Sequence, residues 1–155
     1  MAKSPSPFSV EDANDSTGFL LWQVTALWQR EIARVLQPHD LTQVQYALLA
    51  SLLWLSGRGE HVTQSRLARH AKLDAMMTSQ VLRALESRGL LERRAHPTDT
   101  RARALRLTTA GRALTTRVVP VVENADAAFF AGLGAGRAGL NRNLLALIEA
   151  RAEAD

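Results

Sequence analysis

The sequence predicts a mainly α-helical chain that carries one small β-hairpin, in the order α-α-α-α-β-β-α-α. Apolar residues recur at a helical period along most of the chain, and two short strand patterns flank a Pro-Thr-Asp turn. No internal repeat of domain scale is visible. With 155 residues, of which 46% are hydrophobic and 22% charged, we expect one compact domain or one domain with an extended appendage.

The first third of the chain predicts an arm and two helices. Residues 1–16 are rich in Ser, Pro and Asp and are expected to form a mobile N-terminal arm. A helical pattern starts at Thr17 and runs until Pro38 interrupts it. Thr42 is a candidate N-cap for the nearly all-apolar stretch from Val44 to Leu55, which we expect to form a helix in the core.

Two short amphipathic helices are expected next, separated by a three-residue turn. Thr63 is the candidate N-cap of the first, from Gln64 to Ala71. Asp74 is the candidate N-cap of the second, which Gly89 is expected to end. Four residues of the second helix recur at i, i+3, i+4 and i+7 and should face inward: Thr78, Val81, Leu82 and Leu85.

A hairpin and a long helix follow. Leu90 to Ala95 and Ala102 to Thr108 predict the two strands, and Pro97 to Asp99 predict the tip. After Gly111 we expect a long helix that reaches Phe129.

The C-terminal stretch predicts a flexible joint and a last helix. The joint is Gly132 to Gly139, which contains four glycines, and the helix carries an apolar stripe of Leu140, Leu144, Leu147 and Ile148. Together with the aromatic residues of the other terminal helices, this stripe is more apolar surface than one small lobe covers easily. Pairing two chains through these helices would cover it, and packing within a monomer is the alternative.

Basic charge is concentrated in the middle of the chain. Residues 63–108 hold ten Lys or Arg against four Asp or Glu, a net of +6, whereas the remaining residues hold nine against eleven, a net of −2. Localised basic charge attracts phosphate groups. No Phe, Trp or Tyr occurs between Leu55 and Ala128, although proteins that bind single strands stack bases on aromatic side chains. The pattern therefore favours duplex DNA as the partner.

Helix, turn, helix and hairpin in this order are typical of a winged helix-turn-helix, whose second helix enters the major groove. Outward residues near the start of that helix are expected to meet base edges, with Gln80 able to bond adenine bidentately and Arg83 able to reach guanine or phosphate. For Met77, core packing is the alternative. The outward set is Ala75, Met76, Met77, Ser79, Gln80 and Arg83.

The hairpin and the shorter helix supply further candidate DNA contacts. We expect Arg101 to enter the minor groove, with Asp99 orienting it by an ion pair. The arginines that flank or line the hairpin are Arg93, Arg94, Arg101, Arg103 and Arg106. On the shorter helix, the residues expected to place the module on phosphates are Gln64, Ser65, Arg66 and Arg69.

The run from Leu41 to Gly111 resembles the MarR family of bacterial regulators. The segments that carry the resemblance are LTQVQYALLASL, TQSRLARHAKLD, TSQVLRALESRGLLERR and HPTDTRARALRLTTAGR. The last is similar to the family's D-P-x-D-x-R-…-L-T-x-x-G wing. Thr100 stands where the family commonly has a first wing arginine, so minor-groove insertion would depend on Arg101 alone.

The resemblance implies a DNA-binding lobe over residues 41–111, held in an obligate homodimer by helices within residues 17–40 and 112–155. It also implies a palindromic operator, usually repression, and release by a small, often aromatic or phenolic ligand. Such a ligand would sit between the dimer base and the lobe, a kind of pocket that is mainly apolar. The residues expected near it are Trp22, Trp28, His39, Gln43, Tyr46 and Trp54, for which plain core and interface packing is the alternative.

Other functions are less well supported by the sequence. A sequence-tolerant architectural DNA-binding protein without a ligand is the main alternative. A metal-responsive regulator would need the four histidines (His39, His61, His70 and His96) to converge without any cysteine, so no metal is expected. No cofactor and no enzymatic activity are expected, because phosphate-binding, nucleophile-elbow and H-E-x-x-H motifs are absent. Neither a signal sequence nor a membrane span is recognisable, so we expect a soluble cytoplasmic protein.

Overall fold

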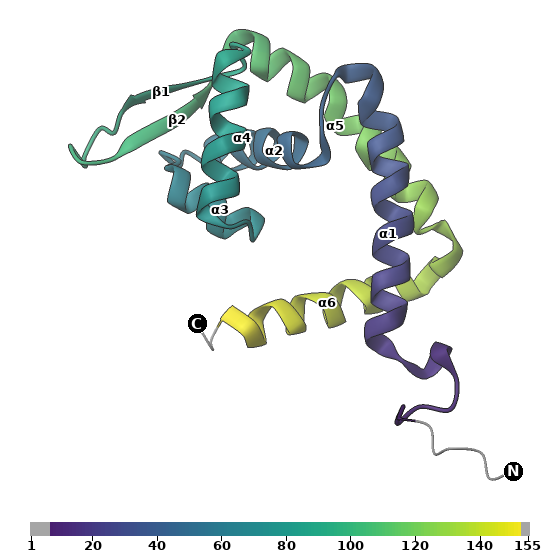
Figure 1. Cartoon of the computed structure of the whole chain (residues 1–155). Coiled ribbons are helices and arrows are strands. Elements are labelled where there is room, and N and C mark those ends of the chain that lie inside the picture. The colour runs from purple at the N-terminus through teal and green to yellow at the C-terminus, as the bar shows by residue number, and fades with distance from the viewer. Residues whose placement is uncertain (1–6, 153–155) are drawn as a thin grey trace, which may run out of the picture.

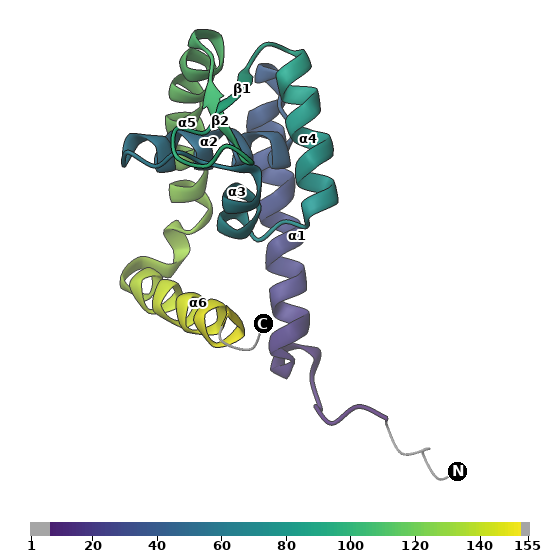
Figure 2. The same ribbon diagram turned by 90° about the vertical axis from the view of Figure 1, so that its left-hand side faces the viewer.

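The computed structural model describes residues 7–152. Its elements are α1 (Thr17–Leu36), α2 (Gln43–Gly57), α3 (Gln64–Ala71), α4 (Ala75–Ser87), β1 (Leu91–Ala95), β2 (Arg103–Leu107), α5 (Thr109–Phe129) and α6 (Arg137–Ala152). The predicted order is confirmed. Figure 1 shows α2, α3, α4 and the hairpin as a lobe, from which α1 and α5 lead away side by side. Figure 2 shows α6 turning back below that lobe. We call residues 41–111 the reading lobe.

The expected N-terminal arm lies only partly within the described structure, since residues 1–6 fall outside it. Ala13–Asp15 form one short 3-10 turn, and the Asp12 carboxylate caps this turn by accepting the N–H of Asn14 at 2.7 Å. The side chain of Ser16 then accepts the N–H of Phe19 and begins α1. The mobility of the arm stays a prediction.

Side-chain caps fix the starts of the lobe helices at the predicted residues. Thr42 forms a capping box with Gln45, in which each side chain bonds the other residue's backbone N–H. Thr63 Oγ1 accepts the N–H of Arg66 at 3.2 Å, and Asp74 Oδ1 accepts that of Met77 at 2.8 Å. These caps place the two short helices where the sequence predicts them.

The core of the reading lobe is built mainly from leucines. The α2 residues buried in it are Leu48, Leu49, Leu52 and Leu55. Against them pack Leu67 of α3, with Leu82 and Leu85 of α4, all fully buried. Three of the four inward positions predicted for α4 are buried, and Val81 is half-buried. Continuous burial of these apolar side chains holds the short helices in place.

The hairpin pairs antiparallel with Leu91 opposite Leu107 and Ala95 opposite Arg103. Its free edge is covered in part by the segment before α3, because the N–H of Leu105 donates to the carbonyl of Val62 at 2.7 Å. Thr63 also bridges to Ala104. The hairpin is therefore anchored at its base to the turn that precedes α3.

The long helix was expected to start after Gly111, and it starts three residues earlier, at Thr109. Thr108 is the N-cap, accepting the Gly111 N–H at 3.0 Å, so that Gly111 lies inside the first turn of α5. A Cβ atom at this position would lie 1.7 Å from the carbonyl oxygen of Leu90. The glycine is needed for close contact between α5 and the start of β1, and it does not interrupt the helix.

The expected flexible joint at Gly132 to Gly139 is shorter and more regular than predicted. Ala131–Gly136 form 3-10 turns, broken only where Gly134 takes a positive φ of 50°, and α6 already begins at Arg137. The first residues of α6 include Gly139, because a glycine inside a helix weakens it without forbidding it.

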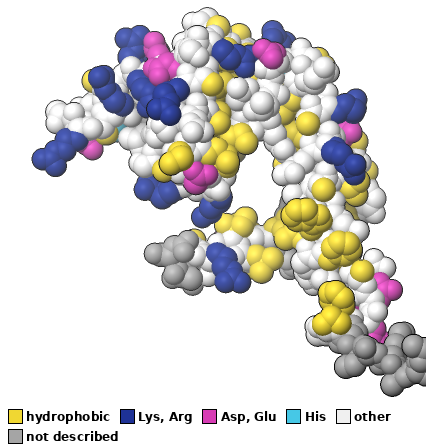
Figure 3. Space-filling model, viewed as in Figure 1, with side chains coloured by type: hydrophobic (Ala, Val, Ile, Leu, Met, Phe, Trp, Pro, Cys, Tyr) yellow, Lys and Arg dark blue, Asp and Glu magenta, His cyan; other side chains and the backbone are white. Residues whose placement is uncertain are grey.

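The terminal helices leave much apolar surface uncovered. No residue of α6 is buried, and Leu145, Leu147 and Ile148 are about half exposed. Exposed apolar residues on α1 include Leu21 and Trp22. Figure 3 shows hydrophobic side chains along one end of α1 and on α6, around an opening below the reading lobe. A helix as exposed as α6 gains little stability from packing within this chain.

Candidate nucleic-acid interface

The face of α4 that points away from the core is open to solvent. Met76 is 74% exposed and Met77 41%, so neither methionine packs in the core of this chain. Ala75, Gln80 and Arg83 are also exposed, whereas Ser79 is half-buried. Since the cap at Asp74 orders the first turn, this face is rigid where a reading helix contacts bases.

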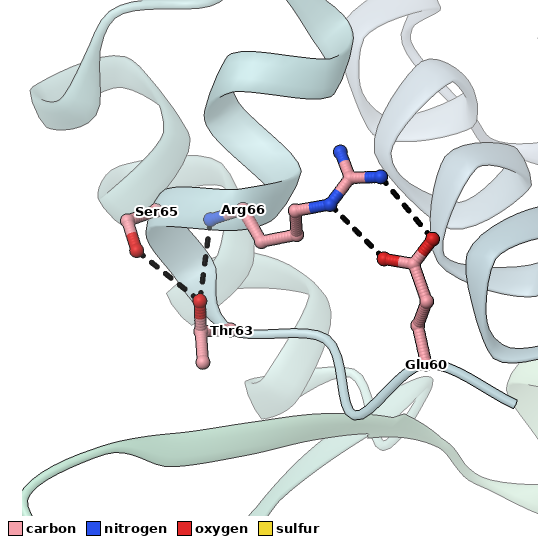
Figure 4. A network of polar contacts seen from close by, with 4 residues as sticks. All are labelled: Glu60, Thr63, Ser65 and Arg66. Atoms are coloured by element: carbon pink, nitrogen blue, oxygen red, sulfur yellow. Dashed lines mark hydrogen bonds and ion pairs between the residues drawn. The ribbon is translucent and has the colours of Figure 1, made fainter.

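Three of the four α3 residues expected to bind phosphates, Gln64, Ser65 and Arg66, already have side-chain partners within the lobe. Arg66 forms a two-pronged ion pair with Glu60, at 3.0 and 3.2 Å, and Ser65 Oγ lies 3.1 Å from Thr63 Oγ1 (Figure 4). Arg69 is exposed and forms no hydrogen bond or ion pair within residues 7–152. Of these residues, Arg69 has the side chain that is free to meet a phosphate.

Arg93 links three elements of the reading lobe, a role that the sequence reasoning missed. Its Nε lies 3.2 Å from a carboxylate oxygen of Glu86 on α4, and its Nη1 donates to Gln64 Oε1 on α3 at 3.2 Å. Because strand residues alternate, Arg93 shares the inward face with Leu91. That alternation could have shown that Arg93 points toward α3 and α4.

Arg94 lies on the opposite face of the hairpin and pairs with Glu92 at 2.8 Å. The hydrogen bond from Arg94 lowers the pKa of the Glu92 carboxyl, and the charges of Arg94 and Arg106 lower it further. Exposed pairs of this kind add little stability, so the pairing leaves Arg94 able to change partner.

The tip of the hairpin is shaped by two side chains that accept backbone N–H groups. Asp99 Oδ1 accepts the N–H of Arg101 at 3.0 Å, and His96 Nδ1 accepts that of Asp99 at 3.1 Å. The expected ion pair between Asp99 and the Arg101 guanidinium is therefore wrong, because the carboxylate is used by the backbone of the turn. The turn itself fixes the position from which the Arg101 side chain projects.

Several arginines of the reading lobe form no side-chain hydrogen bond or ion pair with the described residues. Within the described residues, no hydrogen bond or ion pair is formed by the side chains of Arg69, Arg83, Arg101, Arg103 and Arg106. All five are exposed. Figure 3 shows Lys and Arg side chains over the hairpin and the lobe. Free cationic groups on one lobe form a surface suited to a polyanion.

The residues expected around a ligand are not gathered in one place. Trp22 is 73% exposed on α1, and Gln43 lines a different hollow at the start of α2. Trp54 lies near the other end of α2, about 16 Å along the helix axis, where the Arg58 guanidinium covers its ring at 4.3 Å. His39 is half-buried in the 3-10 turn after α1.

Trp28 and Tyr46 both lie near Asp126 of α5. The indole N–H of Trp28 donates to Asp126 Oδ1 at 2.7 Å. Burial raises the pKa of the Tyr46 hydroxyl, and the charges of Asp126 and Glu123 raise it further. A pocket of about 290 Å³ beside Trp28 has mostly apolar walls from α1, α5 and α6, with Asp126 as its charged group. Of the residues expected at a ligand, these two are the ones that share a contact region.

Two features of residues 7–152 concern metal binding and membrane insertion. In that range no three His, Asp or Glu side chains lie close enough to hold a metal ion. No single helix there is long and apolar enough to cross a bilayer; only α5 and α6 taken together pass on length and composition, and they are bent by 79° at their junction.

Sequence comparisons relate the chain to known regulators. The MarR family model matches residues 41–102. The chain is 46% identical over 118 residues to the uncharacterised HTH-type transcriptional regulator YdcH of Bacillus subtilis (strain 168), covering 76% of this chain and 80% of that protein. It is 36% identical over 118 residues to the HTH-type transcriptional repressor Rv2887 of Mycobacterium tuberculosis (strain H37Rv), covering 76% and 82%.

Solved structures share the same architecture. Rv2887 in complex with salicylic acid superposes with a TM-score of 0.63 at 33% identity, covering 88% of this chain and 98% of that one. A mutant of Escherichia coli MarR complexed with operator DNA superposes with a TM-score of 0.71 at 26% identity, covering 84% and 91%. The chain therefore belongs to the MarR family, a family of transcription regulators and not of enzymes.

Proposed function

We propose that this protein is a homodimeric transcription repressor that binds a palindromic duplex operator and leaves it when a small aromatic ligand binds. The observation that carries the proposal is the exposed outward face of α4 together with the unpaired guanidinium groups of Arg83, Arg101 and Arg103. A free helix face and free cations on a rigid lobe are what groove reading and phosphate contact require.

The side chains on α4 favour base contacts of particular kinds. The amide of Gln80 matches the donor and acceptor pattern of adenine in the major groove, and the thioethers of Met76 and Met77 suit thymine methyl groups. Arg101 at the hairpin tip suits a narrow minor groove, where the negative potential is strongest. Arg69 and Arg103 supply phosphate contacts that set the register of the lobe on DNA.

The uncovered apolar surface supports the homodimer. Leu145, Leu147 and Ile148 of α6, with Leu21 of α1, are about half exposed. A second copy that brings the same residues would bury this surface in an isologous interface, and it would set two copies of α4 about one DNA turn apart. That spacing requires a palindromic operator.

The relatives support both repression and a ligand. Rv2887 is named a repressor, and its solved structure holds salicylic acid. In this chain we propose that an aromatic ligand contacts Trp28 and Tyr46 beside the pocket between α1, α5 and α6. A ligand there would act on the angle between the terminal helices and the reading lobe, and therefore on the spacing of the two α4 helices.

To test this function, the protein first selects duplexes from a random-sequence pool. Its affinity is then measured for the selected duplex and for a scrambled one. A regulator is expected to prefer its selected duplex by about 10³-fold or more at physiological salt. A ratio near one would mean a sequence-tolerant architectural protein instead. For the ligand, thermal unfolding with salicylic acid is the measurement, because saturation at 100 times the dissociation constant adds about 2.7 kcal/mol of stability.

A further inference from the structure

The ring of His96 holds the turn at the tip of the hairpin. Its Nδ1 accepts the N–H of Asp99 at 3.1 Å and lies 3.4 Å from the N–H of Thr98, while the His96 N–H itself bonds the carbonyl of Ala102 at 3.4 Å. A nitrogen accepts hydrogen bonds only while it carries no proton. The turn seen in the structure therefore requires the neutral ring with its proton on Nε2.

This turn sets the direction of Arg101. The carboxylate of Asp99 accepts the N–H of Arg101 at 3.0 Å, so the acceptor on His96 and the side chain of Asp99 form two consecutive links from the start of the tip to that arginine. Loss of the first link removes one of the two bonds that hold the backbone of Asp99, the other being the Ala102 N–H that donates to the Asp99 carbonyl at 3.1 Å, and so it loosens the second link. The guanidinium of Arg101 would then have to be ordered at the moment of DNA binding, which costs affinity.

A proton on Nδ1 of His96 would have the Thr98 hydroxyl, at 3.4 Å, as an acceptor, and no carboxylate bonded to the ring within residues 7–152. The ring packs edge-on against His61 from the segment before α3, with 5.7 Å between ring centroids. A hollow of about 460 Å³ beside His61 reaches Ala95 and Pro97, the two neighbours of His96 in the chain, and its charged lining residues are Glu60, Arg94, Arg106 and Arg112. Glu60 is paired with Arg66, and the nearest carboxylate in the turn, that of Asp99, already serves the backbone of Arg101.

We propose that His96 is a positioning residue for DNA binding, whose neutral ring holds the hairpin tip in place and whose protonation releases it, so that acidification weakens operator recognition. The DNA part of this inference rests on the proposed function above. Histidine is the side chain whose ordinary charge change falls between about pH 5 and pH 8. The hairpin tip is thus a pH-sensitive part of the reading surface.

Two variants, His96→Asn and His96→Ala, are compared with the wild type to distinguish this role from a purely structural one. In His96→Asn, the amide oxygen takes the place of Nδ1 and accepts the same N–H groups without titrating. In His96→Ala no acceptor remains at any pH. We expect His96→Asn to bind the selected duplex equally at pH 5.5 and 8.0, and His96→Ala to bind about three- to tenfold more weakly at both, the effect of one net hydrogen bond.

The affinity of the wild-type protein for the selected duplex should change with pH, from that of His96→Asn to that of His96→Ala. At constant ionic strength it should resemble His96→Asn at pH 8.0 and His96→Ala at pH 5.5. His61→Asn, which removes the neighbouring imidazole and keeps His96, should retain the pH dependence of the wild type. Wild-type affinity that is constant or rises on acidification, or a pH dependence that His61→Asn abolishes and His96→Asn keeps, would overturn the proposal.

A measurement on the free protein tests the role of His96 in the turn independently of DNA binding. In ¹H–¹⁵N spectra of the free protein, the Asp99 amide should titrate with the same midpoint as the His96 ring, and it should stay constant in His96→Asn. An Asp99 amide that ignores the titration of His96 would refute the link within the turn. If every variant lacked duplex selectivity at every pH, the proposed function and the DNA part of this inference would both fail, while the amide titration would still decide the role of His96 in the turn.

Discussion

The reading lobe and the terminal helices differ in how they cover their apolar side chains. In the lobe, Leu52, Leu67 and Leu82 are fully buried, and each helix begins at a side-chain cap. In α6 no residue is buried, and apolar side chains of α1 lie in solvent nearby. The lobe is therefore complete within one chain, whereas the terminal helices need a second surface. The buried core therefore lies in the first region, as do the proposed DNA contacts, whereas the proposed dimer contacts lie in the second.

The largest expected effect comes from the lobe core. Leu82→Ala removes a fully buried side chain from α4 and should lower the free energy of unfolding by about 2–5 kcal/mol, because the surrounding leucines cannot collapse into the space. Urea denaturation measures this. Met76→Ala on the exposed face of the same helix is the control, with an expected change within about 0.5 kcal/mol. Similar losses for the two variants would contradict the division between buried and reading faces of α4.

A charge placed on the terminal helices should change the stability of the proposed dimer. Leu147→Glu places a charge on the apolar stripe of α6 and should weaken the dimer by about 2 kcal/mol or more, because a charge buried without a partner is costly. Sedimentation at several protein concentrations measures the dimer. Ala138→Glu is the control, because it adds the same charge nine residues earlier, about two and a half turns away and therefore on the opposite face of α6. A dimer that withstands Leu147→Glu would place the interface elsewhere.

Base reading by the lobe is tested at Gln80. Since its side chain is exposed on α4, Gln80→Ala should cost about 1–3 kcal/mol on the selected duplex and relax discrimination at one base pair. Competition between duplexes with single substitutions is the measurement. Weakening that is uniform over all sequences would instead assign Gln80 to phosphate contact.

A smaller effect should separate two arginines of the hairpin. Arg101→Ala removes an unpaired guanidinium and should reduce the slope of log affinity against log salt by about 1. Arg94→Ala removes the same charge from a residue that pairs with Glu92, so its effect on the slope should be smaller. Equal slopes for Arg101→Ala and the wild type would remove Arg101 from the interface.

The smallest effect concerns the contact between α2 and α5. Burial and the nearby carboxylates raise the pKa of Tyr46 above its ordinary value of 10.0. The folded state therefore favours the neutral hydroxyl, and the stability that follows is complete below pH 10.0 and is lost as the pH rises through the pKa of the folded state. Tyr46→Phe should lessen this alkaline loss by less than about 1 kcal/mol. Urea denaturation between neutral and alkaline pH measures it; an identical decline in both proteins would contradict the assignment.

Local signals in the sequence were sufficient for most of the fold. Thr42, Thr63 and Asp74 are caps because their side chains reach N–H groups two or three residues on, so the spacing alone predicts them. The role of Gly111 could not be predicted in this way. It depends on the approach of Leu90, which is distant in sequence, and a lone glycine in a helical pattern reads equally well as a break.

The sequence was sufficient to predict which residues of the candidate site are exposed. It was not sufficient to predict which of them bond to one another. Periodicity alone assigns Met76, Gln80 and Arg83 to the outward face of α4. It does not reveal that Arg66 is held by Glu60, or that Asp99 bonds a backbone N–H instead of a guanidinium. These choices depend on the geometry of turns, in which one carboxylate has several donors within reach.

The close approach of Gly111 to Leu90 also determines how the hairpin can move. Thr108 Oγ1 donates to the carbonyl of Gly89 at 2.6 Å and the Thr108 N–H donates to that of Leu90 at 3.2 Å, so the start of β1 and the end of β2 are fastened together beside the start of α5. From there each strand extends about 17 Å. Tilting that root by about 5° would carry the far end roughly 1.5 Å sideways, about half a hydrogen-bond length. Because Leu105 is also bonded to Val62, and Arg93 to Glu86 and Gln64, such a tilt would have to carry α3 and α4 along with the hairpin.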